Sequence, residues 1–146
     1  MILPVFNNQF KIGTKGINSE DKDMVSIASL ESFSVSFDNG VEEYTPMEAQ
    51  GWKRRLLTAK SFSISLNGKR DIGDVGNDYV ASLYFVTGTA ASTKFEWTMI
   101  DGTKVEFNCI VNCTAAGGDS TAIDALEFEV LSDGKPTVTP APDSAE

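Results

Sequence analysis

The chain contains no histidine and only two cysteines among its 146 residues. Histidine is the usual general base near neutral pH and the commonest metal ligand, so both of those roles lack their usual residue. Without a histidine to activate it, neither cysteine is expected to act as a nucleophile. The sequence also has no phosphate-binding loop, nucleophile elbow or dinucleotide fingerprint. It therefore predicts a protein that is not an enzyme, with no catalytic residues, no metal and no cofactor.

The two cysteines are too far apart along an extended chain to pair with each other. If one strand contained both Cys109 and Cys113, their Cα atoms would lie about 13 Å apart at roughly 3.3 Å per residue. A disulfide needs a Cα separation below about 7 Å. We therefore expect two free thiols, one of them in the core.

Basic residues are scarce, and long apolar runs are absent. The 12 basic and 21 acidic residues give a net charge of −9, of which −6 lies on the last 28 residues. Such a chain should repel nucleic acid, because binding requires cations that neutralise phosphates. No stretch approaches the roughly 20 apolar residues that cross a bilayer, and residues 1–6 lack the basic start of a signal peptide. We expect no membrane contact and synthesis in the cytoplasm.

Several segments alternate apolar and polar residues almost letter by letter. They are residues 32–37, 61–66, 95–99, 105–108 and 126–130. Side chains on a strand point to opposite faces in turn, so this pattern predicts a mainly antiparallel β-fold with one face on a core. The residues that share the apolar phase, and hence the predicted core, are Phe33, Val35, Phe37, Phe62, Ile64, Leu66, Phe95, Trp97, Phe107, Leu126 and Phe128.

Turn and cap signals divide the chain further. Asn39-Gly40 and Asp101-Gly102 are typical of two-residue hairpin turns. Asn77 is predicted to cap a short helix over residues 79–86. We expect an N-terminal arm over residues 1–25, a β-domain over residues 26–133 and a Pro-rich, flexible tail over residues 134–146.

Residues 41–57 interrupt the strand rhythm and form an insert longer than most hairpin loops. Within this insert, Trp52 is followed by the basic residues Lys53, Arg54 and Arg55. Three cations on an acidic chain are too few for a nucleic-acid binder. Two interpretations stay open from composition alone. Either the insert contacts another copy of the chain, or Trp52 folds back onto its own core.

The order of these elements resembles the major tail tube protein of long-tailed bacteriophages. The resemblance spans residues 25–133 and rests on a strand from Ile27, the insert, a short helix start at Asp78-Tyr79-Val80 and the hairpin around Asp101-Gly102-Thr103. Its most specific part is the run from Trp52 to Arg70.

That resemblance implies a two-sheet antiparallel β-sandwich or barrel with one short flanking α-helix and a long inter-strand loop. It implies hexameric rings stacked into a tube of the virion, a bore that conducts DNA without specific binding, and tape measure and tail terminator proteins as partners. The loop would reach a neighbouring ring. The implied interface residues are Glu42, Glu43, Tyr44, Pro46, Met47, Trp52, Lys53, Arg54 and Arg55.

Two other functions stay open at this point. The tube of a contractile tail or injection machine would share the fold. A secreted or surface β-sandwich that binds a ligand such as a carbohydrate would need a signal peptide and exposed aromatic residues on a strand face. The aromatic residues of the strands lie instead in the apolar phase, which favours the structural subunit.

Overall fold

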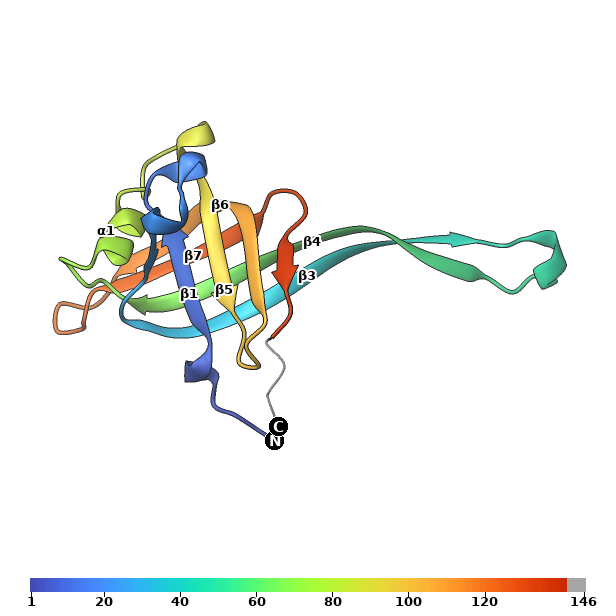
Figure 1. Cartoon of the computed structure of the whole chain (residues 1–146), viewed down its shortest axis with the longest axis horizontal. Coiled ribbons are helices and arrows are strands. Elements are labelled where there is room, and N and C mark those ends of the chain that lie inside the picture. Colours follow the sequence, from blue (N-terminus) through green and yellow to red (C-terminus); the bar gives the residue numbers. More distant parts are fainter. Residues whose placement is uncertain (142–146) are drawn as a thin grey trace.

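A single antiparallel sheet of eight strands forms the body of the protein in the computed structural model, which describes residues 1–141 (Figure 1). The strand order is β2-β1-β5-β6-β7-β4-β3, and β8 pairs with β6. The mainly β fold class is confirmed, but the strands form one continuous sheet where two were predicted. The strands are β1 (Gln9–Gly13), β2 (Met24–Ser26), β3 (Leu30–Tyr44), β4 (Arg54–Lys69), β5 (Ser92–Thr98), β6 (Lys104–Gly117), β7 (Ala125–Ser132) and β8 (Thr137–Thr139).

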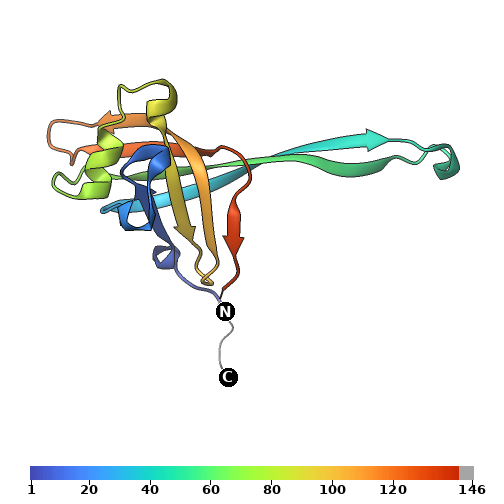
Figure 2. The same cartoon turned by 45° about the horizontal axis from the view of Figure 1, so that its top comes forward.

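The sheet curls back on itself around β6. The first half of β6 pairs with β5, and its second half pairs with β7, so this strand belongs to both halves of the sheet. Phe10 on β1 and Phe33 on β3 lie with ring centroids 4.9 Å apart, although their strands stand near opposite ends of the strand order. The inner faces of the two halves therefore enclose a common core (Figure 2).

Most of the predicted core is confirmed. Ile64, Leu66, Phe95, Phe107, Leu126 and Phe128 are buried, and Phe33, Val35, Phe62 and Trp97 pack against them. The prediction that Phe37 lies in the core is wrong, because Phe37 is 60% exposed. The reason is its position. Phe37 pairs with Phe62, whereas β7 covers β4 only from Ser63 onward, so Phe37 lies just beyond the edge of the curled sheet.

The single α-helix of the described residues, α1 (Val75–Ala81), begins earlier than predicted. Its cap is Asp74, whose carboxylate accepts a hydrogen bond from the backbone N–H of Asn77. Asn77 itself lies inside the helix and is fully buried. Gly76 allows close packing, since a Cβ there would lie 2.3 Å from the carbonyl oxygen of Ser26. Short 3₁₀ turns complete the fold: η1 (Val5–Asn7), η2 (Gly16–Asn18), η3 (Asp21–Asp23), η4 (Met47–Ala49) and η5 (Gly88–Ala91).

The two predicted hairpin turns have different outcomes. Asp101-Gly102 does connect β5 to β6, with the N–H of Gly102 donating to the Met99 carbonyl and Gly102 at φ 96°. Asn39-Gly40 is not a turn, because both residues lie within β3 and pair with Lys60 and Ala59. Gly40 is needed there for space, since a Cβ would lie 2.9 Å from the Cβ of Ala59.

Both ends of the described chain join the sheet. The predicted N-terminal arm contains β1, which pairs with β2 and β5. The predicted flexible tail contains β8, whose Val138 pairs with Val105 of β6. The remainder of the predicted tail, residues 142–146, lies outside the described residues.

Candidate functional site: an exposed β-arm

The most unusual feature of the molecule is a two-stranded arm, residues 37–62, that projects from the curled sheet (Figures 1 and 2). The strands β3 and β4 pair with each other from Phe37–Phe62 to Tyr44–Arg54. From this first pair to the tip of the arm, no other described strand pairs with β3 or β4. At about 3.3 Å per residue, the seven residues from Asp38 to Tyr44 carry the arm roughly 23 Å from the body.

The predicted loop over residues 41–57 is thus largely a continuation of two strands, and only residues 45–53 form the tip. A β-bulge explains why the alternation was hidden. Gly40 pairs with Ala59 and Val41 pairs with Leu57, which leaves Thr58 as an extra residue. One extra residue reverses the phase of everything that follows it. On β4, Leu57 therefore shares a face with Lys60 and Phe62, although its residue number is odd and theirs are even.

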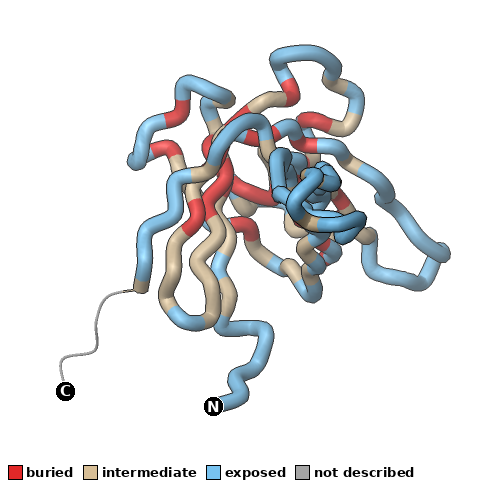
Figure 3. The backbone as a smooth tube through the Cα atoms, turned by 90° about the vertical axis from the view of Figure 1, so that its right-hand side faces the viewer, coloured by how far each residue is buried: buried red, intermediate tan, exposed pale blue. Residues whose placement is uncertain are grey.

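The register places the arm's side chains on two faces. The face continuous with the core carries the pairs Phe37–Phe62, Asn39–Lys60, Val41–Leu57 and Glu43–Arg55, and the other face carries Glu42–Leu56 and Tyr44–Arg54. Nearly every residue of the arm is exposed, and Figure 3 shows the arm end-on in the colour of exposed residues. Four apolar residues on the strands of the arm are exposed: Phe37, Val41, Leu56 and Leu57. Phe37 was predicted to lie in the core and the other three in a loop, and the bulge removed the alternation that would have shown Leu56 and Leu57 to be strand residues.

The tip presents two large apolar side chains to solvent. Met47 begins the 3₁₀ turn η4 and is 97% exposed, and Trp52 is 79% exposed. The chain reverses through Gln50 and Gly51, which both have positive φ. Trp52 does not pack on the core of its own subunit, so the second of the two earlier interpretations is wrong.

The charged residues of the arm divide between its faces. Glu43 accepts from Arg55 at 3.0 Å and lies 3.5 Å from Lys53, so these three predicted residues do come together. Arg54 pairs with Tyr44 across the hairpin, on the opposite face, and no ion pair involves it among the described residues. Exposed ion pairs contribute little stability, about 0–1 kcal/mol. The cations are therefore available to a second surface.

An apolar hollow of about 550 Å³, here called the basal groove, lies where the arm meets the body. Its apolar lining comes from strands of both halves of the sheet and from β8, and it includes Phe37, Phe62, Trp97, Met99, Val105 and Val138. Phe37 and Phe62, at the base of the arm, thus share this groove with residues of the body. Lys60 and Lys135 are the charged side chains at this groove.

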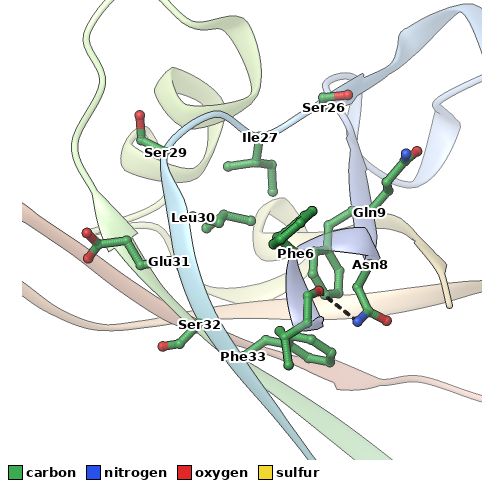
Figure 4. Close-up of a pocket in the computed structure, with 12 residues that line it drawn as sticks. Phe6, Asn8, Gln9, Ser26, Ile27, Ser29, Leu30, Glu31, Ser32 and Phe33 are labelled. Atoms are coloured by element: carbon green, nitrogen blue, oxygen red, sulfur yellow. Dashed lines mark hydrogen bonds between the residues drawn. The ribbon is translucent and has the colours of Figure 1, made fainter. Parts of the chain in front are cut away.

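A second apolar hollow and the two thiols lie in the body. A hollow of about 530 Å³ under the N-terminal segment is lined by Phe6, Leu30 and Phe33, with Glu31 as its single titratable side chain (Figure 4). Burial raises the pKa of the Cys109 thiol to about 12 and also raises that of Cys113, so both thiols stay protonated. Both are free, as expected.

Within residues 1–141, no group of three or more potential metal-ligating side chains lies together. No helix in this part of the chain is long and apolar enough to span a bilayer.

Comparison with known proteins shows a shared fold. No family model matches the sequence, and no curated protein matches it either. A solved structure described as the tail of an empty GTA particle, computed with helical refinement in C6 symmetry, contains a chain that superposes with a TM-score of 0.77 at 20% identity. A chain from the virion of a native gene transfer agent particle superposes with a TM-score of 0.73, also at 20% identity. In both cases 95% of the present chain and 100% of the other chain are covered.

Proposed function

We propose that this chain is a structural subunit of a phage-like tail, in which hexameric rings stack into a tube that conducts DNA. The observation that carries the proposal is an exposed β-arm with uncovered apolar side chains, on a fold shared with a chain of a C6-symmetric GTA tail. The subunit would reside in the virion after synthesis in the host cytoplasm.

The energetics of the arm support assembly with further copies. An isolated two-stranded hairpin is marginally stable in water, and large apolar side chains left exposed gain free energy when covered, about 25 cal/mol per Å². The arm exposes Val41, Met47, Trp52 and Leu56 by half or more. A ring-forming protein has a second copy available for this purpose at every position.

The charge of the chain suits the conduction of DNA without binding it. Residues 37–62 hold four acidic and four basic side chains, so the net charge of −9 belongs to the rest of the chain. A negative body repels a polyanion and lets it slide past. We further propose that the protein has no enzymatic activity and that tape measure and terminator proteins contact the ends of the tube.

A carbohydrate-binding module fits the structure less well. Such a module needs aromatic side chains exposed on a strand face. Phe62 and Phe107 instead stack edge to face with centroids 4.8 Å apart, and Trp97 packs against Phe10 and Phe33. Phe37 and Trp52 are exposed on the arm, and the exposed Phe6 and Phe85 lie outside the strands.

Negative-stain electron microscopy of the concentrated, purified protein tests the proposal. We expect six-fold rings or tubes. A matched control replaces residues 42–56 by an Asn-Gly turn, which joins Val41 to Leu57 where they face each other across the hairpin. This variant should keep the β-sheet circular dichroism spectrum and form no long tubes. A full-length protein that stays monomeric at high concentration and binds a glycan would overturn the proposal.

A further inference from the structure

The two ends of the molecule differ in net charge, and both expose apolar side chains. One end is the arm tip. The other, here called the far pole, consists of residues 69–74, the turn at residues 117–124 and the start of β3; it lies opposite the arm (Figure 1). The strand β4 connects them, since it runs for 16 residues from Arg54 at the arm to Lys69 at the pole.

The far pole holds a shallow hollow lined by apolar and charged side chains. Ile72 and Ile123 line the hollow and are 83% and 69% exposed. The two local cations are already paired, Lys69 with Glu31 at 3.1 Å and Arg70 with Asp78 at 2.7 Å. Four more carboxylates form no ion pair among the described residues: Asp71, Asp74, Asp119 and Asp124. The pole therefore has an excess of negative charge next to exposed isoleucines.

The arm tip has the complementary character. It offers Met47 and Trp52 as projecting apolar side chains and Arg54 as a cation with no ion-pair partner within the described residues. Trp and Arg are the residues most enriched among interface hot spots, and Met fits irregular apolar surfaces. Two acidic bodies repel each other, so a neutral arm with cations near its tip is the part that can approach an acidic pole.

We propose that the arm tip of one copy docks on the far pole of a second copy, with Met47 and Trp52 against Ile72 and Ile123 and Arg54 facing the carboxylates. This inference rests on the proposed function and names the surface that receives the arm. The contact is head-to-tail, because the two surfaces differ. Head-to-tail contacts repeat from copy to copy and build closed rings or continuous stacks.

Cross-linking between copies tests the docking directly. We would mix a Met47→Cys variant with an Ile123→Cys variant, both in a Cys113→Ser background, and add a short bismaleimide. Covalent dimers should form in this mixture and not with Met47→Cys alone. The matched control pairs Met47→Cys with Thr137→Cys, an exposed position on β8; it should give no dimers.

Charge reversal gives an independent measurement. Arg54→Glu in the tip variant should slow cross-linking on the order of tenfold at low salt, because electrostatic steering raises encounter rates. Asp119→Lys in the partner should restore the rate. Asp119 suits this purpose because no side-chain hydrogen bond or ion pair engages it among residues 1–141.

The outcomes separate this inference from the proposed function. Tip-to-pole dimers that respond to the paired charge reversal support the docking. Rings or tubes in the microscope without tip-to-pole dimers would overturn the docking and leave the proposed function standing. Dimers with the Thr137→Cys control instead would place the tip elsewhere and also overturn it. Absence of both assembly and dimers would overturn both.

Discussion

Replacing Asn77 by alanine should destabilise the protein more than the small size of the asparagine side chain suggests. Asn77 is completely buried, and its side chain makes four hydrogen bonds. The amide nitrogen donates to the carbonyls of Ala28 at 3.1 Å and Lys69 at 2.9 Å. The amide oxygen accepts from the guanidinium of Arg70 at 2.9 Å and the backbone N–H of Asp71 at 3.0 Å. One side chain thus holds α1 to the ends of β3 and β4.

The expected loss follows from the groups left behind. Each buried donor or acceptor that loses its partner costs about 1–3 kcal/mol, and water or small shifts will satisfy some of the four. We therefore expect Asn77→Ala to lower the free energy of unfolding by about 3–5 kcal/mol. For a chain of this length, a loss of 1 kcal/mol lowers Tm by roughly 2–4 °C, so Tm should fall by roughly 10 °C.

Thermal and urea unfolding followed by circular dichroism provide the measurement. The control is Asn112→Ala, which removes an exposed asparagine with a single side-chain hydrogen bond to Glu129, and which should change stability by about 0.5 kcal/mol or less. Asn77→Asp tests the mechanism, since it keeps the acceptor and removes both donors to Ala28 and Lys69. Equal effects of Asn77→Ala and Asn112→Ala would refute the reasoning.

Three further predictions concern the arm, the tail and the core. Trp52→Ala combined with Arg54→Glu should leave a folded subunit by circular dichroism that forms no long tubes in electron microscopy; normal tubes would exclude this loop from stacking. Deleting residues 136–146 should lower the free energy of unfolding by about 1–2 kcal/mol in urea titrations, because it removes β8 and uncovers part of the basal groove; an unchanged midpoint would show that β8 contributes nothing. Since burial raises the pKa of Cys109 to about 12, the folded state retains a proton that the unfolded state releases near pH 9. Stability should therefore fall as pH rises from about 9 towards 12, and iodoacetamide should not label Cys109 in the native protein at pH 8; rapid native labelling would contradict this burial.

The strands of the body could be read from local sequence because their side chains alternate between core and solvent. This alternation predicted Ile64, Leu66 and Phe95 correctly as core residues. The Asp101-Gly102 turn was predictable for a similar reason, since a glycine that adopts positive φ leaves a local signature. The free thiols followed from the span of four extended residues between Cys109 and Cys113.

Tertiary structure decided the features on which the proposed function depends. Phe37 has the same local pattern as Phe33, yet it is exposed because β7 ends one pair before it. The arm was hidden because the extra residue at Thr58 reversed the alternation, and a bulge is defined by the partner strand.

Asparagine is a common helix N-cap, so Asn77 was predicted to cap α1. Asp74 is the N-cap instead, because the helix begins where Gly76 can approach Ser26. The sequence by itself determined which segments of the body extend and which of their faces are apolar, since those depend on neighbours along the chain. The tertiary structure alone decided which apolar face stays uncovered, because that depends on where a distant strand ends.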